Sequence, residues 1–423
     1  MTIELGGPHE VIGRIPAAAD VIVPLANGEP VSLIDALDRN AEQLDGVTVH
    51  QMHALHDHPY LHGARRPNLT HRSYFLSHIT RPAFHPGGCD LVPCNFSEVP
   101  KLLREFAATP IVLAAASPPD RHGYFSLGTN ADYVAGLIGL VPFVLEVNEQ
   151  MPRTQGRNVI HHSQVDSWVG VDRPLVEVEP RTPTALDVRI AELVAERIPD
   201  HATIQAGIGA IPDAVVGLLA GHKDLGVHTE LLSDGLVDLI DAGVVTGVHK
   251  VRRPTKVVTT FALGTRKVYD FMNGNPILEM LPVEWVNDPR IIAQQKLMMS
   301  INATTEVDLL GQCASETVAG RYWSGSGGQS DFARGAMYSD GGKGFIVLPS
   351  TAKGGDVSRI VSTLTPGSAV TTMKNTTDHI VTEYGVAELQ GAAIRERARS
   401  LIAIADPAHR AQLEREAQQL GYL

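Results

Sequence analysis

Apolar and polar positions follow two recurring patterns along the chain, one typical of buried strands and one of helices. Short runs rich in Val, Ile and Ala predict strands, and apolar residues at helical spacing predict helices. In the first half we expect strands at 47–49, 74–76, 111–116 and 143–147, with helices over 30–37, 98–106 and 131–140. In the second half we expect strands at 203–206, 226–229, 256–261, 344–348, 369–372 and 380–382, with helices over 212–220, 236–242, 392–402 and 407–420. This alternation predicts an α/β fold with mostly parallel sheets.

A change of composition marks a domain boundary. Residues 175–183, Leu-Val-Glu-Val-Glu-Pro-Arg-Thr-Pro, replace the regular pattern with acids, prolines and threonine before a new helix begins near Asp187. Such a segment is typical of a linker between compact units. We therefore expect two domains, residues 1–181 and residues 182–423.

Charge and composition argue against some classes of binding partner. The chain has 423 residues, and 43% of them are apolar, which is enough to fill more than one core. Its 35 basic and 47 acidic residues give a net charge of −12. Because this field repels nucleic acid and anionic lipid, we expect neither as a partner. An anionic ligand would need a locally built site.

Membrane and targeting signals are weak. The longest apolar stretch, 134–147, is interrupted by glycines and a proline and is shorter than the roughly 20 residues of a bilayer-spanning helix. The start, MTIELGGPHE, has acids where a secretory or transit signal has bases. We expect a cytoplasmic protein. Its three cysteines are an odd number without a CxxC pair, so we expect buried thiols and neither a disulfide framework nor a zinc site.

Two motifs follow predicted strands, at the sheet edge that faces ligands in parallel α/β folds. Gly207-Ile208-Gly209-Ala210-Ile211-Pro212 follows one strand and opens a helix, so its amides could receive an anion. A tight turn with proline at the helix start is an equally good interpretation. The next predicted strand ends in a carboxylate, that of Glu230, in the segment Val227-His228-Thr229-Glu230. Taken alone, this glutamate fits a solvated surface acid better than a catalytic group.

The densest glycine run is Ser324-Gly325-Ser326-Gly327-Gly328-Gln329-Ser330-Asp331-Phe332. Bare backbone of this kind allows close approach of a ligand and offers amides as an oxyanion site. A flexible linker is the alternative, but Trp323, Gln329 and Phe332 are poor linker residues. The pattern favours a functional loop.

Histidines are concentrated between Val49 and His62, and they are His50, His53, His56, His58 and His62. Imidazoles are common metal ligands, but the spacing contains no HExxH motif and Pro59 interrupts any helix. We therefore expect a polar loop beside the domain interface, and no metal site. The sequence also lacks GxSxG, so a serine-hydrolase elbow is not supported.

Together these motifs resemble the acetyl-CoA hydrolase/transferase family, a group of class I CoA-transferases, and especially its 4-hydroxybutyrate CoA-transferase type. The resemblance covers nearly the whole chain. It rests on the segments at 117–128, 146–152, 207–215, 228–235, 269–271, 327–332, 358–361 and 381–385.

The resemblance implies two related open-sheet α/β domains with the active site at the domain interface, and ping-pong transfer of coenzyme A between carboxylic acids. The family's nucleophilic glutamate falls on Glu230, and its oxyanion and thioester contacts fall on Gly327 and Gly328. The residues expected to contact coenzyme A are Gly207, Ile208, Gly209, Ala210, Gly325, Gln329 and Lys353. Lys353 is a candidate together with Lys343 and Lys374, because in a chain of net charge −12 the phosphates need local cations, and a lysine on a solvated turn is the alternative for each.

The implied chemistry uses no tightly bound cofactor, because coenzyme A enters as the acyl-CoA substrate. Glu230 would attack the thioester to form a glutamyl anhydride, which coenzyme A converts to a glutamyl thioester for a second acid to accept. Acetate and 4-hydroxybutyrate are acids of the expected kind. Two alternatives stay open: a thioesterase that uses the same glutamate, and a non-catalytic acyl-CoA sensor. From the resemblance alone we expect a homodimer.

Overall fold

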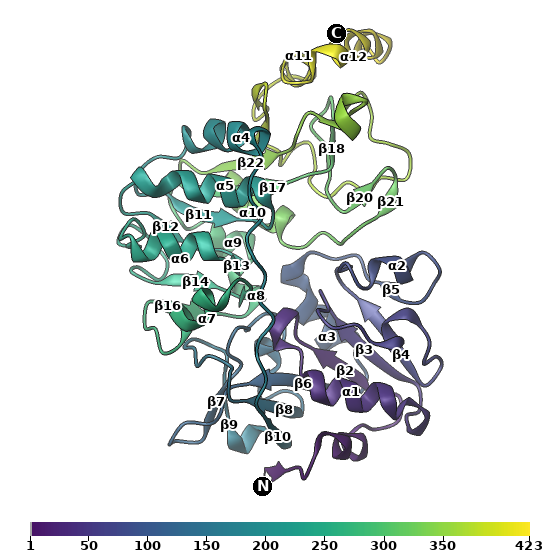
Figure 1. The fold of residues 1–423 in the computed structure, drawn as a ribbon. Coiled ribbons are helices and arrows are strands. Elements are labelled where there is room, and N and C mark those ends of the chain that lie inside the picture. The colour runs from purple at the N-terminus through teal and green to yellow at the C-terminus, as the bar shows by residue number, and fades with distance from the viewer. Residues whose placement is uncertain (1) are drawn as a thin grey trace. The chain divides into compact units, whose positions relative to one another are not determined.

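The computed structural model describes residues 2–423, which form two compact units (Figure 1). Unit 1 comprises the residues up to 179 together with 258–286, and unit 2 comprises 180–257 and 287–423. The chain enters unit 2 within a few residues of the boundary expected after residue 181. The sequence pattern did not predict that 258–286 belong with unit 1. Backbone hydrogen bonds explain this, because Ala131 donates to the carbonyl of Thr260 and Ala262 donates to the carbonyl of Thr129.

Unit 1 is built on an eight-stranded sheet with the order β1-β10-β8-β6-β2-β3-β4-β5. All neighbouring strands are parallel. Helix α1 packs its buried Leu33 and Leu37 in one core with Val21 of β2 and Val49 of β3. The strands are β1 (Ile3–Glu4), β2 (Asp20–Val23), β3 (Val47–Gln51), β4 (Leu69–Ser73), β5 (Asp90–Leu91), β6 (Pro110–Ala116), β8 (Phe143–Asn148) and β10 (Ser167–Val171). The helices are α1 (Val31–Arg39), α2 (Arg81–Phe84), α3 (Val99–Phe106), α7 (Arg266–Met272) and α8 (Val283–Val286).

Unit 2 is built on a six-stranded sheet with the order β12-β11-β17-β22-β26-β27. Its neighbouring strands are parallel except for the final pair, β26 and β27. One core joins Ile346 of β22 and Ile380 of β26 with Leu401 of α11. The strands are β11 (Thr203–Ala206), β12 (Gly226–Val227), β17 (Met298–Ala303), β22 (Lys343–Val347), β26 (His379–Thr382) and β27 (Gly385–Glu388). The helices are α4 (Ala185–Ala195), α5 (Ala210–Leu218), α6 (Asp234–Asp241), α9 (Pro289–Ile292), α10 (Gln329–Tyr338), α11 (Ile394–Ala403) and α12 (Pro407–Gln419).

Short strands complete both units. A hairpin in unit 1 pairs β7 (Tyr124–Ser126) with β9 (Val159–His161). In unit 2, β18 pairs with β19 and β25, and further hairpins join β20 with β21 and β23 with β24. The bounds of these strands are β18 (Glu306–Asp308), β19 (Cys313–Ala314), β20 (Thr317–Val318), β21 (Arg321–Tyr322), β23 (Thr351–Ala352), β24 (Val357–Ser358) and β25 (Ile360–Val361). The other short strands are β13 (Leu231–Leu232), β14 (Val257–Thr259), β15 (Phe261–Ala262) and β16 (Leu278–Met280).

The predicted α/β fold with mostly parallel sheets is confirmed, and three of the predicted elements are wrong. The strand expected at 74–76 ends earlier, as β4. The helix expected over 131–140 is reduced to one short 3₁₀ turn, Ala135–Leu137, because the carboxylate of Asp132 accepts the N–H of Val134 and so satisfies the backbone locally. The strand expected at 369–372 forms only an isolated bridge between Thr372 and Cys313.

No helix within residues 2–423 has both the length and the apolar character needed to cross a membrane. The active site at the domain interface stays a prediction.

Candidate active site around Glu230

The carboxylate of Glu230 lies at the carboxyl edge of the unit 2 sheet. Strands β11 and β12 run parallel with Ile204 beside Val227, and the N–H of His228 extends the ladder to the carbonyl of Ile204 at 3.1 Å. Gly207 and Glu230 each follow these paired residues by three positions. The predicted nucleophile and the predicted glycine turn therefore leave neighbouring strands at the same edge, the one that faces ligands in parallel α/β sheets.

Asn287 holds one oxygen of this carboxylate. The residue is fully buried between α8 and α9 in the chain, and its Nδ2 donates a hydrogen bond of 2.7 Å to Oε2 of Glu230. Its Oδ1 has no hydrogen-bond partner among residues 2–423. Because an ionised carboxylate only accepts hydrogen bonds, the nitrogen of the amide must face Glu230.

Burial raises the pKa of Glu230 to about 7, and the hydrogen bond from Asn287 offsets this only in part. Burial disfavours the ionised carboxylate because it removes the water that would stabilise the charge. The side chain nevertheless keeps partial exposure to solvent. Near neutral pH, Glu230 is therefore an accessible carboxylate whose charge is poorly hydrated, and such a group is a stronger nucleophile than one in bulk water.

Gly328 lies directly against this pair. A Cβ at position 328 would lie 1.9 Å from Oε2 of Glu230 and 2.3 Å from Nδ2 of Asn287. The neighbouring Gly327 has a φ of 56°, which is in the left-handed region that favours glycine. The two predicted glycines thus serve different needs: Gly328 leaves room for the carboxylate, and Gly327 makes the turn before α10.

Close helix packing brings Gly328 beside Asn287. Helix α10 begins directly after Gly328, and α9 begins two residues after Asn287. The two helices approach closely at Gly335, where a Cβ would lie 2.4 Å from Cγ2 of Ile292. The glycine therefore fixes how near the starts of α9 and α10 can lie, and with them the surroundings of Glu230.

His228 holds the segment before Glu230 in place. Its buried ring lies edge-on to the ring of Phe332 in α10, with centroids 6.2 Å apart. Its Nδ1 lies 3.4 Å from Nε2 of Gln295, shortly after α9. Both contacts connect the end of β12 to the helices that carry the rest of the site.

The glycine-rich loop is anchored at both ends. Near its start, Oγ of Ser326 lies 3.3 Å from a carboxylate oxygen of the buried Glu316. Thr371 donates from Oγ1 to the other oxygen of Glu316 at 3.0 Å. At the start of α10, Nε2 of Gln329 donates to Oγ1 of Thr372 at 3.1 Å. These contacts favour the functional loop over the flexible linker.

The glycine turn between β11 and α5 is acidic at its helix end. Gly209 has a φ of 141°, which side chains rarely allow, and Ile208 is 62% exposed. In the first turn of α5, burial and then the nearby charge of Asp234 raise the pKa of Asp213 to about 6. An anion bound at this helix start would therefore meet a carboxyl group that is largely ionised at neutral pH and is protonated as the pH falls below about 6.

Two further predicted coenzyme A contacts, Gly325 and Lys353, lie in different parts of unit 2. Gly325 is buried inside the glycine-rich loop, and Lys353 is exposed on the hairpin between β23 and β24. The structure thus brings Glu230 and Gly328 into contact but leaves Lys353 on a separate hairpin. The binding of coenzyme A by these residues stays a prediction.

The histidine-rich segment pairs with acids of unit 1. His50 belongs to β3, and its Nε2 lies 2.9 Å from Oδ1 of Asp20. Nδ1 of His56 and Nε2 of His58 lie 3.2 Å and 3.6 Å from Oε1 of the buried Glu29. Close contacts with these acids account for several of the histidines.

No sequence motif identified two residues of the site, Asn287 and Glu316. Asn287-Asp288-Pro289 resembles an ordinary helix start, and Asp288 does accept the N–H of Arg290 in that role. Asn287 contacts Glu230 only through the tertiary fold. Glu316 likewise precedes the glycine run without any motif that marks it as the anchor of the loop.

Two family profiles match the chain. The acetyl-CoA hydrolase/transferase N-terminal domain matches residues 4–179, and the C-terminal domain matches residues 264–417. The chain belongs to the acetyl-CoA hydrolase/transferase family. The resemblance drawn from the sequence motifs is thereby confirmed.

Relatives in this family are named as CoA transferases. A succinyl-CoA:cyclohexane-1-carboxylate CoA transferase from Geobacter metallireducens is 43% identical, over 98% of this chain and 95% of its own length. A 4-hydroxybutyrate coenzyme A transferase from Clostridium kluyveri is 42% identical, over 96% of each chain. The crystal structure of RipA from Yersinia pestis matches with a TM-score of 0.94 and 37% identity, over 99% of this chain and 98% of that one. The prediction of an enzyme of the CoA-transferase kind is confirmed.

Proposed function

We propose that the protein moves coenzyme A from a short-chain acyl-CoA to a carboxylate acceptor such as acetate or 4-hydroxybutyrate, with Glu230 as the nucleophile. The observation that carries the proposal is the surroundings of this carboxylate. Glu230 follows the end of strand β12 by three positions, accepts a hydrogen bond of 2.7 Å from Asn287, and lies against a glycine with no room for a side chain. These features supply a poorly hydrated carboxylate and a bare backbone beside it.

The first half of the reaction conserves all atoms of its two reactants. The carboxylate of Glu230 attacks the thioester carbonyl, the carbon–sulfur bond breaks, and coenzyme A leaves as a thiolate while a mixed anhydride forms. The thiolate then attacks the glutamyl carbonyl of that anhydride, which releases the first carboxylate and leaves coenzyme A on Glu230 as a thioester. The ionised form of Glu230 attacks directly, and with a pKa of about 7 it loses its proton to solvent, so no neighbouring base is required.

The second half runs the same two steps in reverse. An acceptor carboxylate attacks the glutamyl thioester, and the released thiolate takes the new acyl group from the anhydride. Each attack creates an oxyanion, and we propose that amides of the Gly327-Gly328 turn, where Gly328 lies against Glu230, stabilise it. Preorganised amides of this kind stabilise such a charge by about 3 kcal/mol each.

Hydrolysis by the same glutamate is the second candidate, since the family name includes both activities. Water would then intercept the anhydride or the glutamyl thioester. We favour transfer because the covalent intermediate preserves the thioester energy that hydrolysis would lose. Raising the acceptor carboxylate at constant acyl-CoA distinguishes the two: transfer saturates with acceptor, whereas hydrolysis proceeds without it. A sensor role is less consistent with a nucleophilic carboxylate placed against bare backbone.

A trapping experiment tests the nucleophile. Incubation with acetyl-CoA in the absence of acceptor, followed by proteolysis and mass spectrometry, should place a coenzyme A thioester on the peptide that contains Glu230. The variant Glu230→Gln should give no adduct there. An adduct on the partly exposed Cys94 instead would contradict the proposal.

The remaining expectations complete the proposal. We propose that the Gly207–Ala210 turn, Gly325, Gln329 and Lys353 contact coenzyme A, that the enzyme works as a cytoplasmic homodimer, and that it needs no tightly bound cofactor for transfer. Light scattering at micromolar concentration tests the dimer. A charge-removing variant, Lys353→Met, tests the phosphate contact by a rise in KM for acyl-CoA with little change in kcat.

A further inference from the structure

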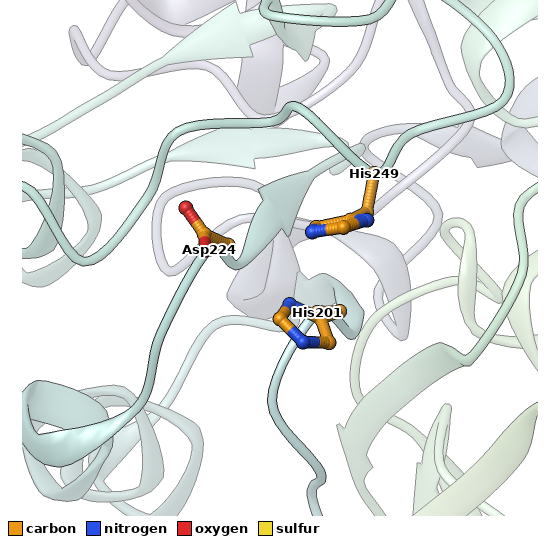
Figure 2. Close-up of side chains that lie close together, drawn as sticks. All are labelled: His201, Asp224 and His249. Atoms are coloured by element: carbon orange, nitrogen blue, oxygen red, sulfur yellow. The ribbon is translucent and has the colours of Figure 1, made fainter.

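Three potential metal ligands lie close together in unit 2, on three segments that share no sequence motif. Each of His201, Asp224 and His249 offers one ligand atom, and these atoms all lie within 4.8 Å of one another. Figure 2 shows the two imidazole rings and the carboxylate gathered around one small region. Both histidines are exposed and Asp224 is half-buried, so an ion could reach the group from solvent.

The register of two strands brings the first two ligands together. Strands β11 and β12 pair in parallel with Thr203 beside Gly226. His201 and Asp224 each precede these paired residues by two positions, so they lie at the amino end of the strand pair. The N–H of His201 donates to the carbonyl of Lys223 at 3.0 Å, which extends the pairing up to the ligands.

Hydrogen bonds also fix the carboxylate and the third ligand. Thr246 donates from Oγ1 to Oδ1 of Asp224 at 2.9 Å. Such a bond orients a carboxylate for a metal and leaves its second oxygen to coordinate. Lys250, the neighbour of His249, is buried, and its Nζ donates to the carbonyls of Val227 at 2.6 Å and Lys256 at 2.7 Å. The loop that carries His249 is thus tied to the same strand, β12.

We propose that His201, Asp224 and His249 bind a divalent first-row transition-metal ion, with Zn²⁺ as the model case. Two imidazoles and one carboxylate suit zinc and its neighbours, whereas Ca²⁺ and Mg²⁺ prefer oxygen ligands. Bond lengths of about 2.1 Å place tetrahedral ligand atoms about 3.4 Å apart. The ligand atoms, all within 4.8 Å of one another, would therefore have to move closer together, and both histidines are exposed. Water would complete the coordination.

Packing of two imidazole rings does not by itself explain the group. The rings of His201 and His249 have centroids 4.1 Å apart. In unit 1, the rings of His161 and His162 have the same separation, but that pair belongs to no group of three ligands among residues 2–423. The carboxylate of Asp224 distinguishes the two pairs. The pair in unit 1 therefore provides a matched control.

The metal site and Glu230 lie at opposite ends of one strand. Asp224 precedes β12 and Glu230 follows it. The ion would therefore brace the amino ends of β11 and β12 and take no part in acyl transfer. This separates the inference from the proposed function, because either can fail without the other.

Metal binding to the full chain, first treated with a chelator, tests the site. Titration with Zn²⁺ against a chromophoric chelator should show one ion per chain in this site. His201→Asn and His249→Asn should each weaken that binding by more than about tenfold, because losing even an outer partner of a ligand often costs this much. The double variant His161→Asn/His162→Asn should bind zinc like the original protein.

Two further readouts make the result decisive. Co²⁺ should give visible absorption bands that disappear in the variant with both His201→Asn and His249→Asn. Zn²⁺ should raise the thermal midpoint of the original protein but not of that variant, while acyl transfer stays unchanged in both. Equal zinc affinity in the original protein and this variant, or loss of binding in the His161 and His162 control, would overturn the inference.

Discussion

Nδ2 of Asn287 donates a hydrogen bond of 2.7 Å to Oε2 of Glu230, although 57 positions separate the two residues in the chain. This bond opposes the effect of burial, which raises the pKa of the carboxyl to about 7. The bond from Asn287 favours the ionised form near neutral pH without solvating the carboxylate as water would. The reactivity of the carboxylate therefore depends on the balance between burial and hydrogen bonding.

Removal of that amide should shift the pH dependence of transfer. In Asn287→Ala the pKa of Glu230 should rise further, because the group that favours its ionised form is gone. We expect the midpoint of the rise in kcat/KM with pH to move upward and the rate near neutral pH to fall about tenfold to a hundredfold. Asn302→Ala removes another buried asparagine of unit 2, one bonded to Gln205, and should leave the midpoint in place. An unchanged midpoint in Asn287→Ala would exclude the proposed balance.

Gly328→Ala should abolish most of the transfer activity. The new Cβ would lie 1.9 Å from Oε2 of Glu230, so the carboxylate or the loop must move, and a misplacement on the order of 1 Å can cost about a hundredfold in rate. Gly217→Ala is the control, because that glycine lies in α5 with nothing within 4 Å of a Cβ. Steady-state turnover and circular dichroism together would separate a local effect from misfolding. Near-normal turnover would remove this glycine from the site.

Ionisation of the buried Glu230 should lower the free energy of unfolding at high pH. Its folded-state pKa of about 7 lies above the ordinary 4.5, so the folded protein retains the proton and loses stability as the pH rises from about 4.5 to about 7. Glu230→Gln removes this cost. We expect the variant to be more stable than the original protein above pH 7, by roughly 1–3 kcal/mol after screening by solvent. Urea unfolding at about pH 5 and about pH 8 measures this difference, which should shrink at the lower pH.

Glu29 in unit 1 should behave in the opposite way. Burial alone would raise its pKa, but hydrogen bonds and charges from His56 and His58 lower it to about 2. The ionised carboxylate therefore stabilises the folded protein. This contribution is fully present above the unfolded pKa of about 4.5 and is lost as the pH falls toward about 2. Glu29→Gln should therefore destabilise the protein by up to about 3 kcal/mol near pH 6 and by progressively less in acid. Unfolding of the Glu42→Gln variant, altered at an exposed glutamate of the same unit, provides the comparison.

The sequence could predict elements and local motifs but not the contacts between distant segments. Glu230 was a candidate because it directly follows a predicted strand, and Gly328 because it belongs to a glycine run; both signals are local. The contact between them depends on α10 packing against α9 at Gly335, which no local pattern encodes. Asn287 was missed for the same reason.

The histidines also show that local sequence patterns do not predict contacts between distant segments. Their concentration between residues 50 and 62 is a strong local signal, yet close contacts with acids such as Glu29 and Asp20 account for several of them. His201, Asp224 and His249 are spread over nearly fifty positions and have no motif. Strand register and a loop tied by Lys250 bring them together, so only the folded chain identifies the group.

Glu230→Asp should change the balance between transfer and hydrolysis. Shortening the side chain by one methylene withdraws the carboxylate by about 1.5 Å, which breaks the bond of 2.7 Å to Asn287 and moves the nucleophile out of reach of the thioester. Transfer should fall by about a hundredfold or more.

The space left behind is bordered by polar groups, including the amide of Asn287 and the backbone at Gly328, and is suited to one water molecule. The aspartate could accept a proton from that water while the loop amides stabilise the oxyanion, so hydrolysis should rise as transfer falls. Both activities are measured in one preparation, from acetyl-CoA with and without acetate, and Glu230→Gln should lack both. Parallel loss of transfer and hydrolysis in the aspartate variant would show that water cannot take the place of the missing methylene, and full transfer in the glutamine variant would exclude Glu230 as the nucleophile.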